Sequence, residues 1–190
     1  MIAVNFYSPK GGVGTTTIAS LFALDMSSSH YVNLVSNDTE SICAVFGCAD
    51  NQFDNHLSTG TKINHGLTVS AKPSNESDFV VIDSRAHLPA ADINVLVVQN
   101  TYLSLRRSMH SKFDLAVAHM LPGHAMSHKD VCDVLMGSGL EQVRIIHWAA
   151  PTARAMDAGM PNRILANVDY QEFSAALRQI ALSSHIGAAS

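Results

Sequence analysis

Glycines and hydroxyl side chains near the start of the chain have the composition of a phosphate-binding loop. Residues 10–17 read KGGVGTTT and follow an apolar run at residues 2–6. Glycine lets a backbone approach an anion closely, and the free N–H groups at a helix start point at that anion with the helix dipole behind them. The usual pattern of such a loop is G-x-x-x-x-G-K-[ST]. In this chain Thr15 occupies the position of the usual lysine, and a different lysine, Lys10, begins the loop.

The exchange of the loop lysine for Thr15 changes the charge that the loop offers to a phosphate. A phosphate-loop lysine neutralises charge between the β- and γ-phosphates. Threonine offers one neutral hydrogen bond of about 1 kcal/mol, against roughly 2–3 kcal/mol for a charge-assisted contact. We therefore expect nucleotide binding through the backbone to survive in weakened form. Hydrolysis is more vulnerable, because charge stabilisation acts there mainly in the transition state.

A second candidate group is the carboxylate of Asp83, which ends the apolar segment 78–83, DFVVID. A carboxylate at a strand end is suited to reach, through water, a Mg²⁺ ion held by a loop hydroxyl. Strands that end in Asp are common, so this pattern indicates a metal site only in combination with the phosphate-binding loop. Together the two patterns predict a metal site that uses Thr16 and Asp83.

Strands and helices must position these groups, and the hydrophobic pattern predicts where they lie. Apolar runs alternate with helical patterns, which indicates βα units around a parallel sheet. We expect strands at residues 2–6, 31–36, 67–71, 78–83, 93–98, 114–120 and 143–148. We expect one helix directly after the loop and further helices at residues 40–46, 103–113, 127–136, 151–158 and 170–186. Residues 49–66 are polar without a clear period and predict a loop.

The prediction for the whole chain is a single α/β domain over residues 1–190. We expect a three-layer P-loop NTPase-like fold, with a mostly parallel sheet of about six to eight strands flanked by helices. The 190 residues suffice for a substantial core, and a net charge of −4 argues against a protein whose whole surface coats nucleic acid. The three cysteines lack C-x-x-C spacing, which favours a reduced cytoplasm over a disulfide framework or zinc site. We expect neither a signal peptide nor a bilayer-spanning segment.

The loop also resembles a known family. Residues 9–17, PKGGVGTTT, are similar to the deviant Walker A motif K-G-G-x-G-K-[ST]-[ST] of the ParA/MinD group of dimeric nucleotide switches, and depart from it at Thr15. DFVVIDSR at residues 78–85 is similar to the family's D-x-x-[IV]-[IV]-D-[ST]-P, with Arg85 in place of proline. Weaker likenesses continue through residues 91–107 and 146–161.

The resemblance implies ATP and Mg²⁺ as cofactors and assigns roles to individual residues. Lys10 would reach across a homodimer to the partner's nucleotide. Asp38 would help to position the attacking water and the metal; the alternative is that it only caps the helix that follows it. His119 and His147 stand where relatives hold the adenine, and an imidazole could stack on a purine; an ordinary half-buried histidine is the alternative. The implied cofactor-binding residues are Gly11, Gly12, Val13, Gly14, Thr15, Thr16, Thr17, His119 and His147; the implied metal-binding residues are Thr16, Asp38 and Asp83.

Two functions are consistent with these patterns. The first is a ParA-like DNA-partition protein that binds ATP–Mg²⁺ and nonspecific DNA with weak or slow hydrolysis, together with a small centromere-binding adaptor. The second is a degenerate relative that acts as a dimeric positioning or scaffold module without useful turnover. The DNA-binding candidates are Arg106, Arg107 and Lys112. Only Arg178 is basic beside the apolar face of the last helix, so we expect this helix to pack on the sheet and not on a membrane. The expected location is the cytoplasm, with nucleoid association if the protein binds DNA.

Overall fold

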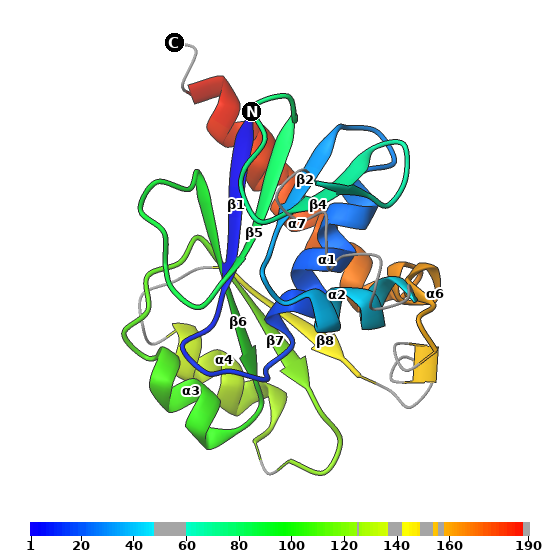
Figure 1. Cartoon of the computed structure of the whole chain (residues 1–190). Coiled ribbons are helices and arrows are strands. Elements are labelled where there is room, and N and C mark those ends of the chain that lie inside the picture. Colours follow the sequence, from blue (N-terminus) through cyan, green and yellow to red (C-terminus); the bar gives the residue numbers. More distant parts are fainter. Residues whose placement is uncertain (48–59, 125, 137–141, 149–153, 156–157, 188–190) are drawn as a thin grey trace.

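The structure is a computed structural model in which an eight-stranded sheet lies between two layers of helices (Figure 1). It describes residues 1–47, 60–124, 126–136, 142–148, 154–155 and 158–187. The described strands are β1 (Ile2–Tyr7), β2 (Val32–Val35), β3 (Thr61–Lys62), β4 (Leu67–Ser70), β5 (Phe79–Ser84), β6 (Ile93–Gln99), β7 (Leu115–Met120) and β8 (Val143–His147). Their order across the sheet is β3-β4-β2-β5-β1-β6-β7-β8. All neighbouring pairs run parallel except β3 and β4, which are antiparallel.

Helices cover both faces of this sheet, as α/β architecture requires for strands that are apolar on both sides. The described helices are α1 (Thr15–Met26), α2 (Thr39–Phe46), α3 (Tyr102–Ser108), α4 (His128–Met136), α6 (Pro161–Leu165) and α7 (Val168–Gly187). Helices α1, α2, α6 and α7 lie over one face, and α3 and α4 lie over the other (Figure 1). The predicted fold class is therefore confirmed.

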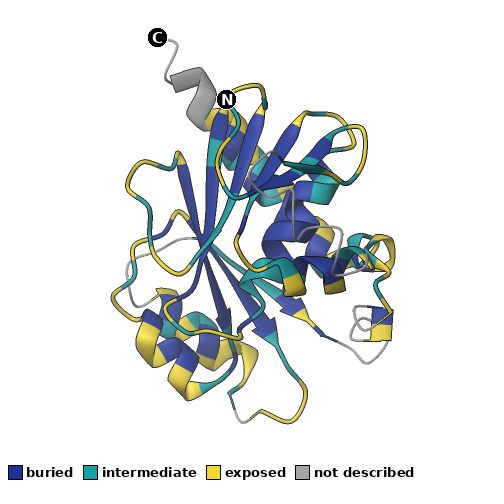
Figure 2. Cartoon of the chain, viewed as in Figure 1, coloured by how far each residue is buried: buried dark blue, intermediate teal, exposed yellow. Residues whose placement is uncertain are grey.

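Each layer of helices closes its own hydrophobic core against the sheet. Buried residues concentrate in the strands and on the helix faces that meet them (Figure 2). The larger core contains Phe6 of β1, Phe22 of α1 and Phe173 of α7, all at 0% exposure. The smaller core lies beneath α3 and α4 and includes Leu96 and Leu135. With both faces covered, ligands have access chiefly at the ends of the strands.

Strand β1 lies at the centre of the sheet, between β5 and β6. The chain leaves β1 through α1 towards β2 on one side, whereas it leaves β6 through α3 towards β7 on the other side. In open parallel sheets, ligands bind in the crevice at the carboxyl ends of the strands where such connections diverge. The loop at residues 8–14 lies at this end of β1 (Figure 1).

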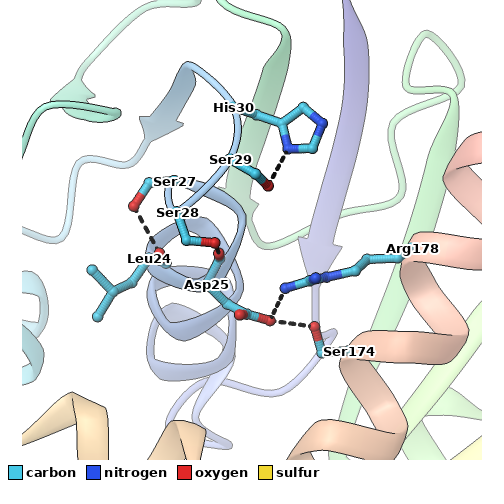
Figure 3. A network of polar contacts seen from close by, with 8 residues as sticks. All are labelled: Leu24, Asp25, Ser27, Ser28, Ser29, His30, Ser174 and Arg178. Carbon is cyan, nitrogen blue, oxygen red and sulfur yellow. Dashed lines mark hydrogen bonds and ion pairs between the residues drawn. The ribbon is translucent and has the colours of Figure 1, made fainter.

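The last long helix, α7, is fixed to α1 by a buried apolar face and by a polar contact. Phe173 and Leu177 are fully buried in the larger core. Asp25 of α1 accepts a hydrogen bond from the Ser174 hydroxyl and forms an ion pair with Arg178 at 2.6 Å (Figure 3). The expectation that this helix packs against the body of the domain is confirmed. Of the helices in the described part of the chain, none combines the length and apolar character that spanning a bilayer requires.

Several predicted boundaries need correction. The helix expected at residues 103–113 ends at Ser108, because the chain turns there and brings Phe113 into the smaller core. Lys112 therefore lies after α3, where its carbonyl accepts a hydrogen bond from Tyr7. Strand β3 and helix α6 were not predicted, although Pro161 at the first turn of α6 is a typical helix start. Most of the helix expected at residues 151–158 lies outside the described residues.

Candidate functional site

The backbone of the glycine-rich loop adopts conformations that favour glycine. Gly12 has φ 73° and Gly14 has φ 90°, and Gly14 directly precedes the first turn of α1. A Cβ atom added at Gly11 or Gly12 would meet no other atom within 4 Å. Val13, which lies between Gly12 and Gly14, is fully buried and anchors the loop to the larger core. The loop thus exposes backbone beside a helix N-terminus, which is the arrangement that binds phosphate.

A pocket of about 870 Å³ opens over this loop. Its floor is the loop and the first turn of α1, and its walls are the segment that follows β2 and the end of β5 with the residue after it. All the predicted loop residues except the buried Val13 line it. The lining residues are Ser8, Lys10, Gly11, Gly12, Gly14, Thr15, Thr16, Thr17, Ser36, Asn37, Asp38, Ser41, Asp83, Ser84 and Arg85.

The carboxylate of Asp83 joins two walls of the pocket to its floor. Its Oδ2 atom accepts hydrogen bonds from Thr16 Oγ1 at 2.8 Å and from Ser36 Oγ at 2.8 Å. Burial raises the pKa of Asp83 above its ordinary value, and the two hydroxyl donors oppose that shift without cancelling it. Thr16 and Asp83, predicted to share a metal ion, are therefore in direct contact.

The donor set of this pocket suits Mg²⁺ held together with a nucleotide. Among the described residues, no cluster of three His, Cys, Asp or Glu side chains could hold a metal ion by itself. Mg²⁺ usually keeps several waters and binds through one or two protein oxygens plus substrate phosphates. One threonine hydroxyl and one carboxylate below a phosphate-binding loop meet that requirement.

Asp38 caps a helix and also lines the pocket. Its Oδ1 accepts a hydrogen bond from Ser41 N at 3.0 Å and its Oδ2 accepts one from Ser41 Oγ at 2.8 Å, which caps α2. The capping interpretation is confirmed. The same side chain is exposed at the pocket wall, so its role in positioning water or metal stays a prediction.

Lys10 is half-buried at the entrance of the loop, where its backbone N–H donates to Ser8 Oγ at 3.3 Å. No described residue accepts a hydrogen bond from its ammonium group. The side chain lines the pocket in a single copy of the chain, and its predicted reach across a dimer stays a prediction.

The two histidines expected at the adenine do not line the pocket. His119 is only 3% exposed; its ring packs against Trp148, with centroids 5.2 Å apart, and lies directly behind Gly14. Burial lowers its pKa to about 3, so the ring is neutral. In this conformation it offers no free face to a purine. His147 is exposed and paired with Asp169 at 3.0 Å, and its role in base binding stays a prediction.

The basic residues predicted to bind DNA lie on the surface around α3. Arg106 and Arg107 are exposed in the last turn of α3, and Lys112 is exposed in the segment that follows. The N-terminal end of α3 follows β6, whose last residue, Gln99, donates through Nε2 to the loop carbonyl of Gly12 at 3.0 Å. This contact connects the segment before α3 to the loop.

Three residues of the site were not predicted from the sequence. Ser36 was not among the predicted site residues, yet its hydroxyl donates to Asp83. Arg85 appeared only as a missing proline, yet it lines the pocket. Gln99 carried no local signal at all, because its loop contact depends on the pairing of β1 with β6. For Arg85, a cation two residues after the Asp of a predicted metal-binding strand was a usable signal.

These features define the chain as a P-loop nucleotide-binding fold, and comparisons with solved structures narrow it further. No protein-family model and no curated protein matches the sequence. A chain of the MinC:MinD cell division complex of Aquifex aeolicus matches with a TM-score of 0.71 at 17% identity, covering 94% of this chain and 96% of that one. Apo McdA of Cyanothece gives 0.72 at 13% identity, covering 95% and 99%. A plasmid partition protein of Borrelia burgdorferi bound to AMPPNP gives 0.67 at 16% identity, covering 96% and 98%. The chain has the fold of the ParA/MinD ATPases.

The close approach of His119 to Gly14 predicts a specific sensitivity of the loop. A Cβ atom at position 14 would lie 2.7 Å from His119 Cε1. Gly14→Ala should therefore lower the free energy of unfolding by the strain of a positive φ, about 1–2 kcal/mol, plus about 1–3 kcal/mol of overpacking. Gly12→Ala is the matched control, since it has a positive φ and no neighbour within 4 Å. Urea denaturation without nucleotide that gives equal losses for both variants would contradict this packing.

The raised pKa of Asp83 predicts how stability depends on pH. The folded chain keeps a proton on Asp83 above the ordinary value of 3.8, so ionisation of this carboxyl destabilises the fold as pH rises. Asp83→Asn should make the nucleotide-free protein more stable than wild type at pH 7. Its advantage should shrink as pH falls through the raised folded-state pKa and should vanish only below the ordinary value of 3.8, where the wild-type carboxyl is protonated in both states. An advantage that is constant with pH in urea titrations would show that burial of the charge is not its cause.

Proposed function

We propose that this chain, acting as one domain over residues 1–190, binds ATP–Mg²⁺ and dimerises with nucleotide. The hydrogen bond between Thr16 and Asp83 under the glycine loop carries this proposal. It brings the predicted metal-binding hydroxyl and carboxylate together within one pocket. When bound, Mg²⁺ would neutralise phosphate charge; the chain's own groups hold and orient the phosphates through the loop backbone and the first turn of α1.

Hydrolysis in this site should be slow. Thr15 lines the pocket in place of a cation, so the loop stabilises developing charge on the phosphates less well. One oxygen of Asp83 also accepts two hydroxyl donors, which fits a group that positions the loop and its ligand. These observations favour a nucleotide-dependent binding state over rapid turnover.

The cellular role that we propose is DNA partition, in the cytoplasm and at the nucleoid. The matched Borrelia protein is described as a putative plasmid partition protein, and Arg106 and Arg107 give this chain an exposed basic pair. A small centromere-binding adaptor would then be the partner. The second candidate is a dimeric positioning module without turnover, favoured by Thr15 and by the match to a MinC:MinD complex.

Calorimetric titration with ATP and Mg²⁺ tests the nucleotide site. We expect measurable heat, and light scattering should show a dimer that forms only with nucleotide. Thr16→Ala should weaken Mg²⁺-dependent binding roughly tenfold, because it removes one contact to a charged group. Ser29→Ala, in the turn beyond the far end of α1, is the control. Absence of both heat and dimer for the wild type would refute the proposal.

Gel shifts with random-sequence duplex DNA and ATP–Mg²⁺ test the basic pair on α3. Arg106→Ala combined with Arg107→Ala should reduce binding and lower the slope of log affinity against log salt by about 2, since two phosphate contacts are lost. Arg163→Ala removes an exposed arginine from α6 and serves as the control. Equal affinities for the double variant and the wild type would exclude this surface as the DNA contact.

A further inference from the structure

The pocket over the glycine loop contains a basic residue, Arg85, that does not belong to the loop. Two basic residues, Lys10 and Arg85, line it together with the acidic residues Asp38 and Asp83. Lys10 precedes the glycines of the loop, whereas Arg85 follows β5 directly. A bound polyphosphate would therefore meet positive charge from the β5 side, although Thr15 gives none from the helix side.

The backbone on both sides of Arg85 is fixed to the strand that leads into the loop. The buried Asn5 of β1 donates through Nδ2 to the Ala86 carbonyl at 3.0 Å. The Ser84 hydroxyl lies 2.8 Å from both Asn5 Oδ1 and the Ala86 carbonyl. In the parallel register, Ser84 pairs with Tyr7, the residue before the pocket-lining Ser8. Arg85 is thus held beside the start of the loop by contacts that do not use its own side chain.

The guanidinium group of Arg85 is free to meet a ligand. The residue is exposed, and no described residue forms a hydrogen bond or ion pair with its side chain. Its charge is near enough to oppose the rise in the pKa of Asp83, but burial prevails at that carboxyl. Arginine stays protonated and presents a planar fork of donors that matches phosphate oxygens in pairs.

We propose that Arg85 binds the phosphates of the nucleotide and supplies the positive charge that the loop lacks at Thr15. This inference rests on the proposed nucleotide binding. The competing role for Arg85 is a solvated cation that only offsets the charge of Asp83. The two roles differ in which nucleotides lose affinity when Arg85 is removed. If Arg85 binds phosphate, the loss of affinity should increase with the number of phosphates on the nucleotide.

The test compares ATP–Mg²⁺, ADP–Mg²⁺ and AMP in calorimetric titrations of the full chain. Arg85→Ala should weaken ATP–Mg²⁺ binding roughly ten- to a hundredfold, as expected for loss of a charge-assisted contact, with a much smaller effect on AMP. Arg85→Lys should give an intermediate loss, because it keeps the charge without the fork. Thr15→Lys in the Arg85→Ala background should recover much of the affinity, since it returns a cation to the loop.

Arg163→Ala is the control and should leave all three affinities unchanged. Wild-type affinity for ATP–Mg²⁺ in Arg85→Ala, or an equal loss for ATP–Mg²⁺ and AMP, would overturn the role of Arg85 and leave the proposed function standing. A wild-type protein that binds none of the three nucleotides would overturn both.

Discussion

The carboxylate of Asp83 joins the segments from which the pocket is built. Oδ2 accepts one hydrogen bond from the first turn of α1 and another from Ser36, the residue after β2, so a single atom connects three segments at the carboxyl edge of the sheet. The carboxylate is held there against the cost of its own burial, which raises its pKa. A site that keeps such a group ready, beneath exposed backbone N–H groups, is organised to receive a cation and an anion together.

Different residues determine the shape of this loop and the charge that it offers to a ligand. Its shape is set from behind by Val13 in the larger core and by the neutral ring of His119 against Gly14. Neither contact uses the position at which the usual loop pattern has a lysine. The exchange to Thr15 can therefore leave the backbone cradle intact while it removes a charge. Binding and turnover depend differently on that charge, so the proposed slow hydrolysis is compatible with a preserved cradle.

Local patterns predicted the fold and the loop well, because glycine spacing, hydroxyls at a helix start and alternating apolar runs act over a few residues. Contacts between distant segments could not be predicted in this way. Ser36 and Arg85 belong to the site because β2 and β5 are neighbours in the sheet. From the sequence, Arg85 was only a departure from a family pattern, and Ser36 was not predicted to belong to the site. His119 was expected at a base, but its place on β7 puts the ring behind the loop. Asp38 was left between two roles, and the structure establishes the cap on α2.

The central claim is that the loop and Asp83 form a binding site for a nucleotide with its metal. A crystal structure grown with a non-hydrolysable ATP analogue and Mg²⁺ tests it most directly. We expect the phosphates on the backbone N–H groups from Gly11 to Thr16 and the metal beside Thr16 and Asp83. An analogue bound elsewhere on the surface, or a pocket that stays empty at saturating analogue, would contradict it.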